Sequence, residues 1–266
     1  MASTPTLTDS FQEEPDFDPP SHAIEFYTRS LQLLAAWEIP YLLSGTYALT
    51  CHTGVVRPTK DIDIFCKPGD APLLLARFKG EGYQITVEDD RWIAKVWSGE
   101  AFFDVIFNMS SASIPITDAW FTEVFTAQVY GTSVRITPPT EFIVSKAFIQ
   151  DRYRYDGADI AHTILKRHDD IDWHRLLSLM ELHWEVLLLH VLNFRFIYPT
   201  ERDRIPRWLF DTLIERVNAQ AELPPAEVRI CRGRLFSPRD YLIDISEWGF
   251  ADLVGKGLDE KHERHL

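Results

Sequence analysis

The sequence has few cysteines, no excess of positive charge and no uninterrupted hydrophobic run, and each shortage removes a class of protein. Cys51, Cys66 and Cys231 form no CxxC pair and cannot all pair within one chain, which favours a reducing, cytoplasmic compartment. Lys and Arg number 27 against 40 Asp and Glu, a formal net charge of −13. Bulk nucleic-acid binding is therefore not expected.

A membrane span is not expected either. The most apolar long segment, residues 176–196, is interrupted by Glu181, His183, Glu185, His190, Asn193 and Arg195. Because a span requires about 20 mostly apolar residues, we predict a buried helix here. The first residues are polar and acidic, without the pattern of a secretory signal, and residues 1–20 are predicted to be a flexible tail.

Short strand and helix patterns alternate in the first half of the chain, and the pattern becomes almost wholly helical after Pro138 and Pro139. With 266 residues, the chain has room for one large or two small domains. We predict an α+β fold with a mixed β-sheet flanked by helices over residues 21–139. A mainly helical domain is predicted over residues 140–266.

The stretch "SGTYALTCHTGVVRPTKDIDIF", residues 44–65, carries the chemistry. The apolar strand "YLLS" leaves through Gly45 into a helix that begins near Thr46. Such a turn presents backbone N–H groups and the positive end of a helix dipole, and Thr46 adds a hydroxyl. We therefore predict that Gly45 and Thr46 bind the phosphates of a nucleotide.

Two aspartates end the same stretch. Side chains alternate along a strand, so Asp61 and Asp63 face one side while Ile62 and Ile64 face the other. A lone Asp-x-Asp is also typical of an acidic surface strand, but a bound cation would relieve the repulsion between the two carboxylates, and carboxylates are ligands of Mg²⁺. Asp104, in the apolar strand "AFFDVIFN", is the expected third acid of a site with two Mg²⁺ ions about 4 Å apart.

The combination resembles the nucleotidyltransferase superfamily of the DNA polymerase beta-like fold, and its small bacterial and abortive-infection toxin-like members. Their motif is Gly followed by Gly or Ser, a spacer, and Asp-x-Asp or Asp-x-Glu; Thr46 departs from it. The resemblance covers residues 40–165. It implies that Arg57 and Thr59 belong to the nucleotide site, and that Lys146 in "EFIVSKAF" contacts the triphosphate.

The resemblance implies transfer of a nucleoside monophosphate from an NTP donor to a hydroxyl of an acceptor, with release of pyrophosphate. Strong net acidity favours a cationic small acceptor such as an aminoglycoside. A tRNA acceptor requires a basic groove, for which Arg229, Arg232 and Arg234 are candidates, although salt bridges within an acidic protein also explain them. A protein hydroxyl is a third possibility, and a catalytically silent nucleotide-binding or partner-binding module is the alternative from another class.

Overall fold

The structure, a computed structural model, describes residues 21–109 and 114–252. The predicted flexible tail, residues 1–20, lies outside them. By packing, the described residues divide into two units. We call residues 21–145 and 162–179 the sheet unit, and residues 146–161 and 180–252 the helical unit. The predicted domain boundary near residue 139 stays a prediction.

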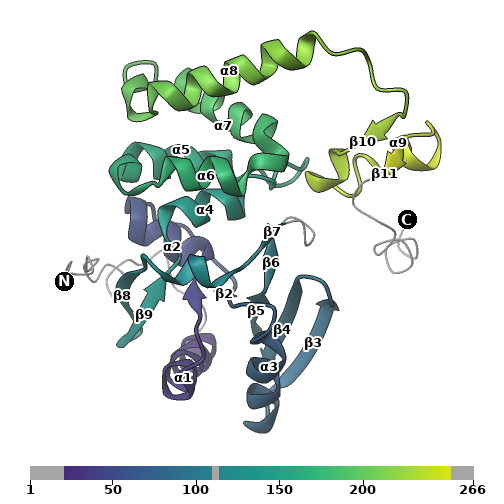
Figure 1. Cartoon of the computed structure of the whole chain (residues 1–266). Coiled ribbons are helices and arrows are strands. Elements are labelled where there is room, and N and C mark those ends of the chain that lie inside the picture. The colour runs from purple at the N-terminus through teal and green to yellow at the C-terminus, as the bar shows by residue number, and fades with distance from the viewer. Residues whose placement is uncertain (1–20, 110–113, 253–266) are drawn as a thin grey trace. The chain divides into compact units, whose positions relative to one another are not determined.

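A seven-stranded mixed sheet, counted over the described residues, organises the sheet unit, in the order β3-β4-β5-β2-β1-β9-β8 (Figure 1). Strand β1 runs antiparallel to β2 and parallel to β9, and β2 runs parallel to β5. The strands are β1 (Leu42–Leu43), β2 (Asp63–Phe65), β3 (Gln84–Asp89), β4 (Ile93–Ser98), β5 (Ala101–Ile106), β8 (Phe125–Val129) and β9 (Thr132–Ile136).

Helices α1 and α3 pack on one face of this sheet, and the alternation of side chains along β5 shows why. Ala101, Phe103 and Val105 are buried, whereas the residues between them are only half-buried. The Phe103 ring lies 5.6 Å from Phe26 of α1 and 5.1 Å from Phe78 of α3, measured between ring centroids. Asp104 lies on the opposite face of β5, among the half-buried residues.

The remaining elements of the sheet unit connect and extend this core. Strands β6 and β7 form a separate antiparallel pair. The helices are α1 (Ser21–Trp37), α2 (Gly45–Thr53), α3 (Ala71–Gly80), η2 (Asp118–Phe121), α4 (Pro139–Lys146), η3 (His168–Asp170) and α6 (Trp173–Leu179), and the two short strands are β6 (Asn108–Met109) and β7 (Ile114–Pro115).

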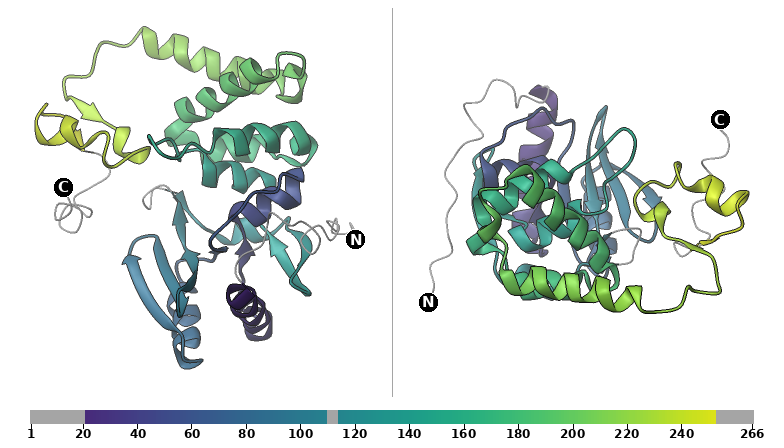
Figure 2. Two further views of the ribbon diagram at one scale, coloured as in Figure 1. Left: turned by 180° about the vertical axis from the view of Figure 1, so that it is seen from behind. Right: turned by 90° about the horizontal axis from the view of Figure 1, so that it is seen from above.

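The helical unit is built around α7 and α8, which lie side by side in both Figure 1 and Figure 2. Its elements are α5 (Gly157–Arg167, the first five residues in this unit), η4 (Glu181–His183), α7 (Trp184–Ile197), η5 (Arg202–Arg204), α8 (Arg207–Ala221), β10 (Ile230–Cys231), η6 (Gly233–Leu235), α9 (Leu242–Ser246) and β11 (Ala251–Asp252). Strands β10 and β11 pair in parallel.

The predicted fold class is confirmed: a mixed sheet with flanking helices precedes a mainly helical region. Strands β8 and β9 form an antiparallel hairpin that turns at Gly131. In the part of the chain that the structure describes, no single helix has the length and apolar character to cross a membrane. The single buried helix predicted over residues 176–196 is wrong: α6 ends at Leu179, and η4 separates it from α7. Among the described residues, the bent pair Trp173–Leu179 and Glu181–Ile197 meets the membrane test by length and composition alone.

Candidate active site

Gly45 stands where β1 turns into α2, and two observations require glycine there. Its φ is +61°, in the left-handed region that side chains with a Cβ rarely adopt. A Cβ at this position would also overlap Oδ2 of Asp63. The Ser44 N–H donates to the carbonyl of Asp63 at 2.9 Å. The first motif residue and the second aspartate are therefore neighbours in space, as the sequence motif predicts.

The three acids lie on two neighbouring strands: Asp63 at the start of β2 with Asp61 just before it, and Asp104 within β5. Asp63 on β2 is the register partner of Asp104 on β5, and parallel partners present their side chains to the same face of a sheet. Asp61 precedes β2 and is half-buried, whereas Ile62 and Ile64 are fully buried, which is the predicted alternation. Burial raises the pKa of Asp104, and the negative charge of Asp61 adds to this increase.

Lys95 of β4 completes this row, and sequence reasoning missed it. It is the register partner of Asp104 on the other side, and its Nζ donates to Asp104 Oδ1 at 2.5 Å. A signal was available in the sequence: Ser98 pairs with Ala101 across a two-residue turn whose first residue, Gly99, has φ +61°. Two-residue hairpins fix the register, and that register places Lys95 opposite Asp104.

Tyr27 of α1 donates hydrogen bonds to both segments that carry the acids. Its hydroxyl lies 2.9 Å from the carbonyl of Lys60 and 3.1 Å from the carbonyl of Phe102. Lys60 directly precedes Asp61, and Phe102 stands two residues before Asp104. The pKa of Tyr27 is raised, first by burial and then by the charge of Asp61, so the hydroxyl stays a donor at neutral pH.

Other predicted residues of the nucleotide site lie around the same turn. Thr46 is the second residue of α2 and is half-buried, at the end of the helix where backbone N–H groups have no partner within the helix. Thr59 Oγ1 donates to the carbonyl of Asp61 at 3.1 Å, which fixes the approach to β2. Arg57 is half-buried in the preceding loop. Contact of these residues with a nucleotide stays a prediction.

Lys146 belongs to the helical unit and is buried there. Its Nζ donates to Asp156 Oδ2 at 2.9 Å and lies 3.6 Å from Asp159 Oδ2. Arg154 also pairs with Asp156, at 3.0 Å. Lys146 is therefore not an exposed surface lysine: it balances two buried carboxylates. Its predicted contact with the triphosphate stays a prediction.

The donor chemistry of the site fits a hard cation in part. Asp61 and Asp63 offer carboxylate oxygens, and the buried Ser44 hydroxyl has no hydrogen-bond partner in the described part of the chain; oxygen donors of this kind suit Mg²⁺. Within residues 21–109 and 114–252, however, no group of three or more His, Cys, Asp and Glu side chains is arranged to hold a metal ion. Asp104 is engaged by Lys95 instead.

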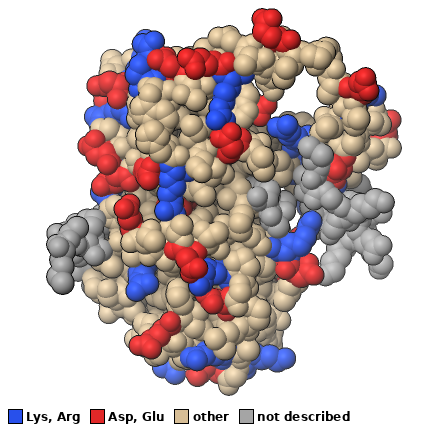
Figure 3. Space-filling model, in the orientation of Figure 1, with Lys and Arg blue, Asp and Glu red and all other residues tan. Residues whose placement is uncertain are grey.

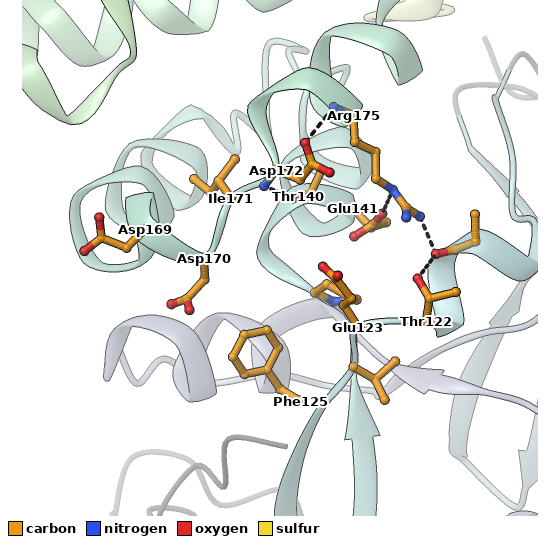
Figure 4. Close-up of a pocket in the computed structure, with 13 residues that line it drawn as sticks. Thr122, Glu123, Phe125, Thr140, Glu141, Asp169, Asp170, Ile171, Asp172 and Arg175 are labelled. Carbon is orange, nitrogen blue, oxygen red and sulfur yellow. Dashed lines mark hydrogen bonds and ion pairs between the residues drawn. The ribbon is translucent and has the colours of Figure 1, made fainter. Parts of the chain in front are cut away.

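The sheet unit also contains a pocket of about 540 Å³ between η2, α4 and α6. In Figure 4, Glu141 of α4 and Arg175 of α6 point toward one another across it; Glu141 Oε1 lies 2.6 Å from Arg175 Nε. Burial raises the pKa of Glu141 to about 7 although Arg175 opposes this shift. None of the predicted site residues lines this pocket.

The three candidate arginines for a basic groove make contacts within the helical unit. Arg232 pairs with Glu185 at 3.2 Å, Arg234 with Asp252 at 2.5 Å, and the Arg229 guanidinium lies over the Phe250 ring at 4.1 Å. Salt bridges within an acidic protein thus account for two of the three.

The solved structures similar to this chain include nucleotidyltransferases and a nucleotidyltransferase-like protein. A lincosamide antibiotic adenylyltransferase, LnuA, bound to lincomycin, is 14% identical, with 55% of this chain and 97% of that chain covered and a TM-score of 0.40. The antibiotic-resistance factor ANT(2'')-Ia is 16% identical over 75% and 98% of the two chains, with a TM-score of 0.42.

An antigenic nucleotidyltransferase-like protein from Paracoccidioides brasiliensis is 16% identical over 70% of this chain and 93% of its own, with a TM-score of 0.44. No protein-family model matches the sequence. No curated protein matches it either.

Proposed function

We propose that the chain is a nucleotidyltransferase that moves a nucleoside monophosphate from an NTP to a hydroxyl of an acceptor. The acceptor oxygen attacks the α-phosphorus and forms a new P–O bond. The bond to the bridging oxygen breaks, and its electron pair leaves with pyrophosphate. The acceptor proton passes to Asp104, whose Oδ1 accepts a hydrogen bond from Lys95.

The observation that carries this proposal is the contact of Gly45 with Asp63. It brings the start of α2, where phosphates are favoured, against a carboxylate that is register partner of a second one, Asp104. Asp61 and Asp63 would hold Mg²⁺. When bound, the ion would neutralise the charge of the phosphates and of the leaving pyrophosphate. Gly45, Thr46, Arg57, Thr59 and Lys146 are proposed to bind the nucleotide.

A cationic small molecule is the acceptor that the charge of the chain favours. The formal net charge is −13, which attracts cations and repels polyanions. A tRNA acceptor needs free basic side chains, and Arg232 and Arg234 are already paired with carboxylates. The proposed place of action is the cytoplasm, on the strength of the three unpaired cysteines.

Thermal unfolding of the full chain with each of the four NTPs, with and without Mg²⁺, tests the nucleotide site. An NTP at about 100 times its dissociation constant adds about 2.7 kcal/mol to the free energy of unfolding. We expect a Mg²⁺-dependent rise of the unfolding temperature with at least one NTP. The absence of any rise at millimolar NTP would favour the silent module.

Turnover is tested by pyrophosphate release in the presence of a panel of acceptors: an aminoglycoside, tRNA and a hydroxyl-bearing protein. Asp61→Asn keeps the shape of the side chain and removes one charge at the proposed Mg²⁺ site, so we expect loss of turnover with an unchanged circular dichroism spectrum. Asp90→Asn, at an exposed residue, makes the same chemical change away from the site and should release pyrophosphate as the wild type does. Normal turnover in Asp61→Asn would contradict the metal assignment.

A further inference from the structure

Lys95, Asp104 and Asp63 form a row across three neighbouring strands. Lys95 on β4 is the register partner of Asp104 on β5, and Asp104 is the register partner of Asp63 on β2. Neighbouring strands lie about 4.8 Å apart, so the three side chains stand next to one another on one face. The Lys95 ammonium stands at the β4 end of the row, followed by the carboxylates of Asp104 and Asp63.

Lys95 is held in this place by an ion pair with Asp104 and by a contact with an aromatic ring. Its Nζ lies 2.5 Å from Asp104 Oδ1 and 4.1 Å from the centroid of the Phe102 ring. Phe102 in turn packs against Trp97, with ring centroids 4.7 Å apart. Only 19% of the Lys95 side chain and 13% of the Asp104 side chain are exposed, unlike most surface pairs, whose long side chains are mobile and contribute little.

This arrangement removes the reason for a second metal ion. A buried carboxylate needs a compensating charge, and a metal shared with Asp61 and Asp63 was the expected source for Asp104. The Lys95 ammonium already supplies that charge from within the chain.

We propose that Lys95 is the resident cation of the active site and limits it to a single divalent ion, held by Asp61 and Asp63. The proposal rests on the proposed function, because it specifies the cation content of the same site. Lys95 is a positioning residue: it holds one oxygen of Asp104 and repels a second metal ion, so that Asp104 stays available to the acceptor rather than to a metal.

The test is an equilibrium titration of the full chain with Mn²⁺, with the free ion followed by electron paramagnetic resonance. It requires no turnover and no knowledge of the acceptor. The variants are Lys95→Met, which keeps the aliphatic stem over Phe102 and loses the charge, and Lys95→Arg, which keeps the charge. The matched control is Lys95→Met combined with Asp104→Asn.

The charges of the row predict the outcome. Asp61, Asp63 and Asp104 with Lys95 sum to −2 in the wild type and in the double variant, but to −3 in Lys95→Met. We expect one Mn²⁺ per chain in the wild type, Lys95→Arg and the double variant. Lys95→Met should bind Mn²⁺ about tenfold more tightly or take a second ion. If Lys95→Met does not fold, Lys95→Gln, whose amide still donates to Asp104, makes the same comparison.

Three results would overturn the proposal: two ions in the wild type, equal binding in Lys95→Met and the wild type, or no binding in any variant. Its failure differs from failure of the nucleotidyltransferase proposal. A wild type stabilised by NTP and Mg²⁺, with no gain in Lys95→Met, leaves the function standing and rejects the role of Lys95. A gain in Lys95→Met without any response to NTP leaves that role standing and rejects the function.

Discussion

At Gly45 an added Cβ atom would prevent the close approach of Asp63 to the start of α2. The residue has a positive φ, and the carboxylate of Asp63 occupies the space that any Cβ would need. Gly54, at the other end of α2, also has a positive φ, +75°, but nothing lies within 4 Å of the place of its Cβ. Substituting each glycine by alanine therefore distinguishes two losses of stability: one from the positive φ, present at both positions, and one from the contact with Asp63, present only at Gly45.

We predict that Gly54→Ala lowers the free energy of unfolding by about 1 kcal/mol, because alanine must adopt a left-handed conformation. Gly45→Ala should cost about 2 kcal/mol more, because Asp63 has to move as well. It should also abolish stabilisation by NTP. Urea unfolding of both variants measures the difference, and equal losses would show that the contact with Asp63 contributes nothing.

A site residue could be predicted from the sequence where the residues that define its role lie close together in the chain. Gly45, Asp61 and Asp63 were predicted as site residues because they belong to one short stretch of sequence, a turn and the strand that follows it. The role of Lys95 was missed because it follows only after the two-residue turn at Gly99 and Glu100 is recognised as the hairpin that sets the register of β4 against β5. Lys146 was assigned from resemblance alone, which could not reveal that Asp156 and Asp159 lie against it.

At the scale of elements, the pair Glu141–Arg175 joins α4 to α6 across the pocket of Figure 4. Glu141 is 2% exposed, and its pKa is raised from 4.5 to about 7, chiefly by burial. The folded chain thus holds this proton more tightly than the unfolded chain does. This group therefore stabilises the fold fully below pH 4.5, and the stabilisation is lost as the pH rises through about 7.

Glu141→Gln removes the titration and keeps the shape, so its effect on stability should depend on pH. Relative to the wild type, the variant should gain about 2 to 3 kcal/mol in free energy of unfolding between pH 4.5 and pH 8. Chemical unfolding at several pH values between these limits measures the gain. Parallel stability curves for the two proteins would mean that Glu141 is ionised without cost, and that Arg175 compensates its burial fully.

The elements themselves were largely predictable, because hydrophobic periodicity and turn residues specify them locally. The strand at "AFFDVIFN" and the helix after Pro138 appear where the pattern places them. Strand β2 is shorter than predicted and begins at Asp63 rather than Asp61, because Asp61 accepts through its carbonyl from Thr59 in the approaching loop. Sheet order was not predictable, since it depends on contacts between distant segments.

At the scale of the whole molecule, charge decides which partners can approach. On the face drawn in Figure 3, Lys and Arg side chains are interspersed with Asp and Glu over the described residues and do not gather into one patch. Together with the net charge of −13, this favours cations over polyanions as ligands.

We therefore predict no measurable binding of tRNA at physiological salt, and binding of an aminoglycoside that weakens as the salt concentration rises, because exposed charge pairs are screened. Filter retention of labelled tRNA and calorimetric titration of the aminoglycoside, each at about 50 and 300 mM salt, measure the two affinities. Arg229→Ala removes the arginine of this cluster whose guanidinium lies over the Phe250 ring. Tight tRNA binding with a steep salt dependence, lost in Arg229→Ala, would instead identify the β10 region as an RNA-binding surface and make tRNA the acceptor to test first.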